Sequence, residues 1–293
     1  MKPRSKWPIS NWAWPDVTVD QAVRHALALG LERVDAQWLL LHACARGADG
    51  RAWLLAHAAD ALPPETHSVF DAMVMRRLAG EPLAYITGQT EFYGLPLQVD
   101  ARVLDPRADT ETLVDWALEV MDTRDTAAPQ RLIDLGTGSG AIALALKHER
   151  PFWDVHALDR SADALAVARA NAQRLGLDLH LHVGDWLRGM ERNFALIVAN
   201  PPYIAAADPH LDQLQHEPLQ ALASGALGLD DLAVIVAQAP QHLAPGGWLL
   251  LEHGYDQADA VRTLLQRAGF VQVQSRRDVS GIQRCSGGQW PGL

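Results

Sequence analysis

The chain has 293 residues, of which 48% are hydrophobic and 20% charged, and its formal net charge is -10. This composition can fill a sizeable core and excludes a disordered chain, while the acidity argues against tight sequence-independent binding to nucleic acid. The two cysteines, Cys44 and Cys285, are too few for a disulfide framework or a structural zinc site, so we expect free thiols, no metal and a reducing cytoplasmic location. The basic N-terminus is not followed by an apolar segment, and no apolar run is long enough for a membrane span, so we expect neither a signal peptide nor a membrane helix.

The N-terminal part of the chain has the pattern of a small all-helical domain. Apolar residues recur at helical spacing from about residue 17 to residue 80. Glycines and the Pro63-Pro64 pair divide this region into three to five short helices, and Thr18 and Asp35 are suitable helix caps. No catalytic group of residues is recognisable here.

A short connector follows, in which the periodicity changes from helical to extended. Residues 85–88 and 91–99 have the composition of short strands, which predicts a β-hairpin connector over residues 82–108. Residues 110–121 are helical in pattern, and the polar stretch 123–130 is expected to be a loop.

The remainder of the chain alternates between strand and helix patterns. The segments are 131–135, 141–147, 155–158, 162–175, 179–183, 194–199, 232–242, 248–252, 257–268 and 270–274. Such alternation predicts a mainly parallel, doubly wound α/β sheet. We therefore divide the chain into a helical domain (1–81), the connector (82–108) and an α/β domain (109–293).

A glycine-rich turn joins the first strand of this sheet to its helix. Its residues are Gly136, Thr137, Gly138, Ser139 and Gly140. Backbone N–H groups in such a turn, together with the helix N-terminus, can hold an anion. Because the glycine spacing also satisfies the dinucleotide fingerprint, the turn alone does not distinguish NAD from other cofactors.

Two acidic positions follow the next strands of the sheet. Asp159 comes directly after the second strand and is placed to hold ribose hydroxyls through its carboxylate. Asp185-Trp186 follow the third strand, where a carboxylate and a flat ring could meet an adenine. A tryptophan in a chain that has ten is also often a packing residue.

The most informative motif is Asn200-Pro201-Pro202-Tyr203, which ends the apolar run 194–199. Pro201 restricts Asn200 to an extended conformation, and neither proline has an N–H to occupy nearby carbonyl oxygens. The Asn200 side-chain oxygen and the Pro201 carbonyl can therefore accept both N–H bonds of a planar amino group, while Tyr203 offers a flat surface. At the carboxyl end of a strand in an α/β sheet, this arrangement predicts a binding site for a planar nitrogen substrate.

Together these motifs resemble the class I S-adenosylmethionine-dependent methyltransferases that modify planar nitrogens. The segment Arg77 to Gly94, then Val103-Leu-Asp-Pro106-Arg107-Ala-Asp109-Thr-Glu111, is similar to the protein-glutamine N5-methyltransferase family called PrmC or HemK. The resemblance spans residues 17–288 and implies a Rossmann-like methyltransferase fold. It also implies methylation of the glutamine in the Gly-Gly-Gln motif of class 1 peptide chain release factors, which are the expected protein partners.

The resemblance also assigns roles to individual residues. It implies that Gly136 to Gly140, Asp159, Asp185, Trp186 and Asn200 contact S-adenosylmethionine. Asn200, Pro201, Pro202 and Tyr203 would hold the substrate glutamine, and Asn200, Pro201 and Tyr203 would be catalytic. The helical domain would recognise the folded release factor.

The chain departs from the family pattern at two connector positions. Ala108 replaces a proline, and Asp105 stands where an apolar residue is usual. The tail after Asp278 also diverges, and its Gly287-Gly288-Gln289 copies the target tripeptide, which we interpret as a glycine-rich tail rather than a site of self-modification.

Four other functions are compatible with parts of the pattern. A methyltransferase of ribosomal-protein glutamine shares the tetrapeptide, but Asp109-Thr110-Glu111 resembles the release-factor branch. A DNA adenine-N6 methyltransferase would present the same amino group from a flipped base, but the chain is acidic and lacks a basic target-reading domain. A nicotinamide oxidoreductase has no evident use for the tetrapeptide, and a non-catalytic binding protein has no evident need for Asn200 and Asp159.

Overall fold

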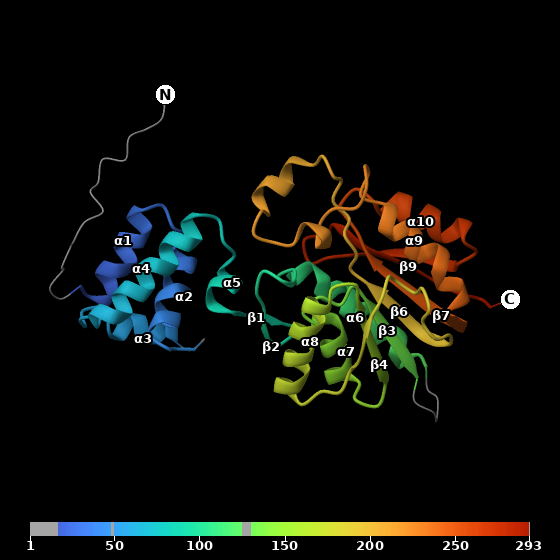
Figure 1. The fold of residues 1–293 in the computed structure, drawn as a ribbon, viewed down its shortest axis with the longest axis horizontal. Helices are drawn as coiled ribbons and strands as arrows, with labels where there is room; N and C mark the ends of the chain where they lie inside the picture. The colour runs from blue at the N-terminus through green and yellow to red at the C-terminus, as the bar shows by residue number, and fades with distance from the viewer. Residues whose placement is uncertain (1–16, 48–49, 125–129, 293) are drawn as a thin grey trace. The chain divides into compact units, whose positions relative to one another are not determined.

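The computed structural model describes residues 17–47, 50–124 and 130–292 and divides into two compact units, 1–87 and 88–293. Figure 1 shows the elements in chain order. The expectation about a signal peptide concerns residues 1–16, and most of the loop expected over 123–130 lies at 125–129, so both fall outside the described residues. Among the residues described, no helix combines the length and the apolar character that a membrane span requires.

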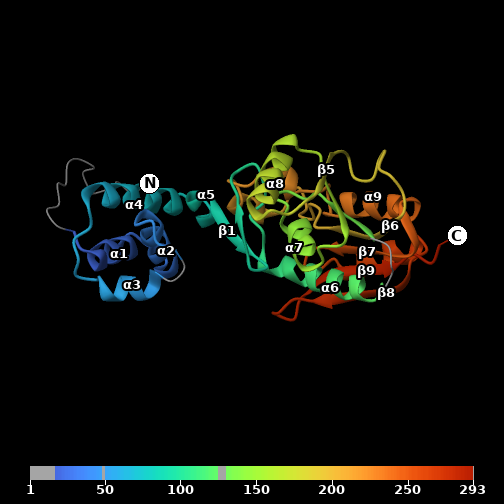
Figure 2. The ribbon, with the colours of Figure 1, turned by 90° about the horizontal axis from the view of Figure 1, so that it is seen from below.

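The first unit is helical, as predicted. Its helices are α1 (Val19–Ala28), α2 (Arg33–Ala43), α3 (Gly50–Ala56), α4 (Pro64–Leu78) and α5 (Leu83–Thr87), and Figure 2 shows α1 to α4 packed together. Thr18 caps α1 as expected, through a capping box with Gln21. The prediction for Asp35 was wrong, because it lies inside α2 and its carboxylate accepts a hydrogen bond from Arg77 at 2.7 Å.

The strand expected at residues 85–88 is instead the end of helix α5. The N–H groups of Tyr85 and Ile86 both donate to the Pro82 carbonyl, so the proline begins the helical turn. Ala84, Tyr85 and Ile86 are buried in succession, whereas a half-buried strand would alternate. The aromatic and β-branched residues had favoured a strand, but the preceding proline and the packing of Ile86 on the helical core decide for a helix.

The connector hairpin is present in the second unit. Strands β1 (Gln89–Phe92) and β2 (Leu95–Gln98) pair antiparallel, with Phe92 opposite Leu95. The two residues between them have positive φ angles, 51° at Tyr93 and 72° at Gly94. A two-residue turn with both φ angles positive matches the twist of the strands, so this short turn fixes the register.

The rest of the second unit is a seven-stranded sheet in the order β5-β4-β3-β6-β7-β9-β8. All neighbours pair in parallel except β9, which is antiparallel to β7 and β8. The strands are β3 (Arg131–Leu135), β4 (Asp154–Asp159), β5 (His180–Val183), β6 (Phe194–Ala199), β7 (Leu243–Glu252), β8 (Val271–Arg277) and β9 (Gln283–Gln289). The strand order reverses between β3 and β6, so the carboxyl ends of these two strands form the crevice where such sheets bind ligands.

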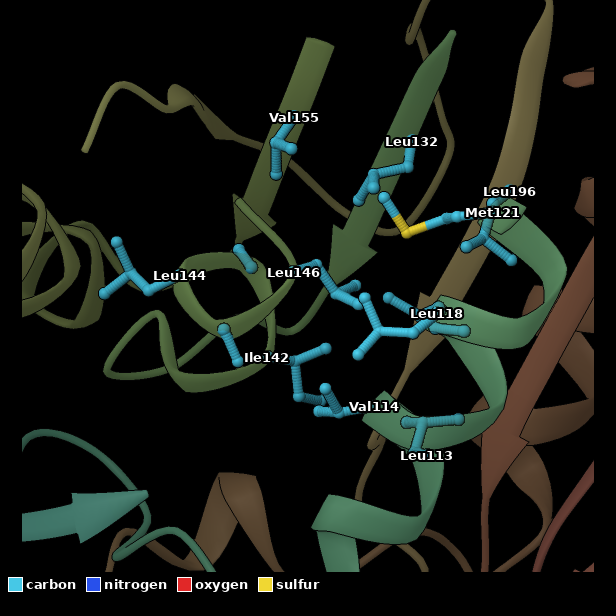
Figure 3. Close-up of a cluster of buried hydrophobic side chains, with 14 of the residues drawn as sticks. Leu113, Val114, Leu118, Met121, Leu132, Ile142, Leu144, Leu146, Val155 and Leu196 are labelled. Atoms are coloured by element: carbon cyan, nitrogen blue, oxygen red, sulfur yellow. The ribbon is translucent and has the colours of Figure 1, made fainter. Parts of the chain in front are cut away.

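Helices cover both faces of this sheet. Short 3-10 turn η1 (Ala108–Thr110) leads into α6 (Glu111–Asp122), which packs on one face with α7 (Ala141–Glu149) and α8 (Ala162–Leu175). Helices α9 (Asp230–Gln238) and α10 (Ala258–Arg267) cover the other face. Figure 3 shows the first core, in which Leu118 and Met121 of α6 meet Leu146 of α7 over Leu132 and Leu196 of the sheet.

Strand β9 was not predicted, because its sequence Gln-Arg-Cys-Ser-Gly-Gly-Gln lacks the apolar alternation of a strand. It lies between β7 and β8, and residues 285–288 are buried. A Cβ atom at Gly287 would lie 2.6 Å from the Leu249 carbonyl oxygen and 3.0 Å from the Trp116 ring. Glycine is therefore required at this position for β9 to pack under α6.

Candidate active site

A cleft lies at the crevice between β3 and β6, entirely within the second unit. It encloses about 920 Å³, including the solvent at its mouth. The predicted residues that line it are Gly136, Thr137, Gly138, Ser139, Asp159, Asp185, Trp186, Asn200 and Pro202. Gly140, Pro201 and Tyr203 lie next to these residues in sequence but do not line the cleft.

Most backbone N–H groups of the glycine-rich turn donate hydrogen bonds within the protein, so they do not point freely into the cleft. Gly136 and Thr137 donate their backbone N–H groups to the Leu158 carbonyl at 2.8 and 2.9 Å, and Gly138 donates to the Asp159 carboxylate at 2.9 Å. Gly140 donates to the Thr137 carbonyl at 2.8 Å. A turn with these N–H groups occupied is poorly suited to a pyrophosphate, so it favours a cofactor without one over NAD.

Two glycines of the turn have identifiable steric roles. Gly136 has φ of +71°, a conformation that other residues rarely adopt, and a Cβ there would only touch the Trp186 ring, at 3.4 Å. Gly140 has φ of +85°, and a Cβ there would lie 3.2 Å from the Ala168 Cβ. Gly140 thus allows helix α7 to begin close to helix α8.

Asp159 and Trp186 are both held in place by hydrogen bonds. The Asp159 carboxylate accepts from Gly138 N–H and from Ser161 N–H, both at 2.9 Å, and its remaining lone pairs can accept from hydroxyl groups in the cleft. Trp186 has a φ of +48° and donates its indole N–H to Asp231 at 3.1 Å. The strained backbone and this bond fix the ring beside Gly136, while the exposed Asp185 lines the cleft edge.

These residues fit S-adenosylmethionine, on the evidence of the cleft itself. Its ribose hydroxyls suit the Asp159 carboxylate, and its adenine suits the edge formed by Asp185 and Trp186. The glycine turn suits the methionine part of the cofactor, because few of its backbone N–H groups are free to bind a phosphate. Buried Asp134 closes the turn from below: its carboxylate accepts from the Thr137 hydroxyl at 2.6 Å, and burial raises its pKa to about 7.

Asn200 lies where strand β6 ends, at the cleft wall. Its side-chain Nδ2 donates to the Thr110 hydroxyl at 3.2 Å. Across residues 50–124 and 130–292, no protein donor is hydrogen-bonded to Asn200 Oδ1 or to the Pro201 carbonyl. The two acceptors predicted for the substrate amide are therefore available.

Tyr203 is held in place by two hydrogen bonds. Its hydroxyl donates to Glu252 Oε1 at 3.3 Å, and its carbonyl accepts from the Gln257 side chain at 2.9 Å. Burial, followed by the negative charge of Glu252, raises the pKa of Tyr203. The phenol therefore stays neutral, and the two hydrogen bonds fix the tyrosine beside Pro202.

A second loop, which sequence reasoning did not assign to the site, forms another side of the cleft. Pro218, Gln220 and Ala221 line it. Arg107 anchors this loop by donating to the buried Glu217 carboxylate at 2.5 Å, and Arg160 donates to the Gln220 carbonyl at 2.7 Å.

Thr110 and Glu252 contact predicted site residues, and periodicity could not identify them. Both are buried, with 3% and 1% of their surface exposed. Thr110 contacts Asn200 and Glu252 contacts Tyr203, although each lies far from its partner in sequence. The sequence offered two indirect signals: Thr110 lies within the family motif Asp109-Thr110-Glu111, and Glu252 is a polar residue at the end of an apolar run, which is strand β7.

Two protein families match this chain. The family described as the PrmC N-terminal domain matches residues 22–88, and the methyltransferase small domain matches residues 114–276. A release factor glutamine methyltransferase of Xylella fastidiosa strain Temecula1 is 48% identical over 269 residues, covering 90% of this chain and 95% of that protein. One from Escherichia coli K12 is 42% identical, covering 92% of this chain and 96% of that protein.

Solved structures share the fold at low identity. A methyltransferase from Pyrococcus furiosus has a TM-score of 0.50 and 17% identity, covering 76% of this chain and 98% of its own. The delta-N METTL16 MTase domain has a TM-score of 0.51 and 15% identity, covering 69% of this chain and 90% of its own. Both are class I methyltransferase folds, which confirms the fold predicted for the sheet. With relatives this similar over nearly its whole length, the chain belongs to the PrmC/HemK family of S-adenosylmethionine-dependent release factor glutamine methyltransferases.

Proposed function

We propose that this protein methylates the side-chain amide nitrogen, N5, of the glutamine in the Gly-Gly-Gln motif of class 1 peptide chain release factors. The observation that carries the proposal is the pair of acceptors at the end of β6, Asn200 Oδ1 and the Pro201 carbonyl, beside a cleft suited to S-adenosylmethionine. The names of the curated relatives support a release factor as the substrate.

The chemical difficulty lies in the nucleophile. The lone pair of an amide nitrogen is delocalised into its carbonyl, so the protein must position the nitrogen and raise its electron density. Asn200 Oδ1 and the Pro201 carbonyl do this by accepting both N–H bonds. The bound cofactor supplies an electrophilic sulfonium methyl group for in-line transfer.

The protein contributes mainly alignment and electrostatics. Proximity and orientation alone can contribute about 7 to 11 kcal/mol to such a reaction. Pro202 and Tyr203 would pack against the bound amide. After transfer the nitrogen loses its extra proton to water. No covalent intermediate with the protein is needed. A glutamate in place of the glutamine brings no N–H donors and leaves both acceptors unmatched, so we expect its rejection by a factor of about 10⁴.

We also propose the division of labour expected from the sequence. Residues 1–81 would recognise the folded release factor, 82–108 would form the connector, and 109–293 would carry out the transfer. Asn200, Pro201, Pro202 and Tyr203 would hold the glutamine. Gly136 to Gly140, Asp159, Asp185, Trp186 and Asn200 would contact S-adenosylmethionine.

The test is a competition for one labelled methyl donor. Purified protein is given labelled S-adenosylmethionine together with release factor, ribosomal proteins and duplex DNA, and the labelled product is identified by mass spectrometry. We expect label on the Gly-Gly-Gln glutamine and none on a release factor with Gly-Gly-Glu. Label on a ribosomal protein or on adenine, with release factor unlabelled, would replace this proposal with the corresponding alternative.

A further inference from the structure

Glu252 is a buried carboxylate that the mechanism above does not use. It ends strand β7, and its Oε1 accepts from the Tyr203 hydroxyl. Its Oε2 is buried without a partner of good hydrogen-bond geometry in the described residues, and the Thr110 hydroxyl is a neighbouring donor. Burying a carboxylate with an unsatisfied oxygen costs free energy, so its presence calls for a compensating role.

Thr110 connects this carboxylate to Asn200. The Thr110 oxygen receives a hydrogen bond from Asn200 Nδ2, so the hydroxyl hydrogen of Thr110 is free to point toward another acceptor. Glu252 offers that acceptor. An ionised carboxylate can only accept hydrogen bonds, so a Thr110 hydroxyl turned toward Glu252 would donate to it, while the Thr110 oxygen accepts from Asn200.

We propose that Glu252 is a positioning residue which, acting through Thr110, fixes the rotation of the Asn200 amide so that Oδ1, and not the NH2 group, faces the substrate glutamine. The inference rests on the proposed function. A group at position 252 that can donate would allow these hydrogen bonds to reverse: Thr110 would donate to Asn200, and the amide would turn its NH2 group to the substrate. Two NH2 groups would then face each other, and the acceptor would be lost.

The charges around Glu252 make this control dependent on pH. Burial raises its pKa to about 7, while the Thr110 and Tyr203 hydroxyls and Arg284 act to lower it, and Asp109 acts to raise it. Cys285, opposite Glu252 on β9, is also close enough to be influenced by its charge. The acceptor-only form of Glu252 therefore becomes dominant as pH rises through neutrality, and turnover should rise with it.

Four variants test the inference. Thr110→Ser keeps the hydroxyl and should retain kcat within a few-fold, whereas Thr110→Val and Glu252→Gln should lower kcat on a Gly-Gly-Gln peptide by about 100-fold. Glu252→Gln should also lose the rise of kcat between pH 6 and 8. The matched control is Asp105→Asn, which removes a different carboxyl whose pKa burial raises and which should keep both the wild-type kcat and its rise with pH.

A binding measurement reports amide orientation separately from turnover. Calorimetry with S-adenosylhomocysteine present compares peptides with Gln and Glu at the target position. The wild type should prefer Gln strongly, and Glu252→Gln and Thr110→Val should narrow that preference at least tenfold, because an exposed NH2 group can bind a carboxylate.

Two results would overturn the inference: equal kcat for Thr110→Val and Thr110→Ser, or a Glu252→Gln enzyme with wild-type kcat and peptide preference. If Glu252→Gln fails to fold, the Thr110 pair decides. A wild-type enzyme that methylates no Gly-Gly-Gln substrate would instead refute the proposed function, so the two failures are distinguishable.

Discussion

At the scale of single residues, we predict that the reaction depends most directly on Asn200. Replacing Asn200 with Ala removes one of the two acceptors that orient the substrate amide, and it leaves the Thr110 hydroxyl without its donor. We expect kcat with release factor to fall at least about 100-fold, the usual effect of removing one preorganised polar contact. Circular dichroism should show an intact fold, since the lost Thr110 bond stabilises by only about 1 kcal/mol. A near-normal rate constant for methyl transfer in a single-turnover assay would contradict this role.

The residues of the site differ in how far the sequence could predict them. Asp159 ends strand β4 and Asn200 follows strand β6, so their place at one edge of the sheet could be predicted from the two apolar runs. Thr110 and Glu252 could not be assigned roles, because their contacts join distant segments and depend on how α6 and β7 pack. The sequence also could not show that the N–H groups of the glycine turn bond to Leu158 and Asp159.

At the scale of elements, the close approach of α7 and α8 should depend on glycine at position 140. Gly140→Ala must place an alanine in the left-handed region, which costs about 1–2 kcal/mol, and its Cβ would press on Leu144 and Ala168. Gly176→Ala is the matched control, because it has a similar φ of +66° but no atom within 4 Å of its Cβ. Urea denaturation should show a larger loss for Gly140→Ala, by about 1–3 kcal/mol. Equal losses of unfolding free energy in the two variants would mean that the contact between α7 and α8 does not restrict residue 140.

The outer strands β4 and β5 should make stability dependent on pH. His156 Nδ1 lies 2.9 Å from His182 Nε2, and the two rings are stacked. Burial lowers the pKa of both histidines, so between the ordinary value of 6.5 and the lowered value the unfolded chain binds more protons. The two histidines therefore contribute their whole share of the free energy of unfolding above pH 6.5. That share is lost as the pH falls through their pKa values in the folded protein.

A variant isolates this contribution from other titrating groups. Buried Glu252 and Asp134 act in the opposite direction, because their raised pKa values favour the folded state at lower pH. The useful quantity is thus the difference between wild type and His182→Gln in urea titrations from pH 8 to 5. The wild type should lose more stability on acidification than His182→Gln, whereas His210→Gln, on an exposed residue, should follow the wild type. An unchanged difference across this range would rule out the histidine pair.

The two elements that differ from prediction show where local patterns fail. Helix α5 follows a proline that begins the turn, and this local signal outweighed the strand-like Tyr85-Ile86. Strand β9 pairs with β7 on one side and with β8 on the other, and its buried residues 285–288 are small. Its stability comes from neighbours far away in the chain, so no local pattern could reveal it, whereas the continuous apolar run of β6 made that strand predictable.

At the scale of the whole molecule, the chain has separate cores for its two units. The helical core contains residues from Val17 to Ile86, and both cores of the sheet contain residues from Phe92 onward. The sequence placed the first boundary near residue 81, and that division remains a prediction. Separate cores make it reasonable to test the transferase unit without the helices.

Removing residues 1–87 should separate recognition of the release factor from transfer. If the helices recognise the folded protein, kcat/KM for intact release factor should fall about 100-fold or more, equivalent to about 2.7 kcal/mol of binding. Activity on a short Gly-Gly-Gln peptide should change by only a few-fold, and steady-state assays on the two substrates measure both. Equal losses on peptide and protein would reject a recognition role for the helical unit.

The placement of β9 has a consequence for the enzyme as a possible target of its own reaction. Gly287-Gly288-Gln289 has the sequence of the proposed target, yet its backbone is paired to β7 on one side and to β8 on the other. The Gln289 amide is also engaged, donating to the Gly246 carbonyl and accepting from Gln272. Self-recognition is thus prevented by conformation and not by sequence: only an unfolded copy would display this tripeptide to a working one.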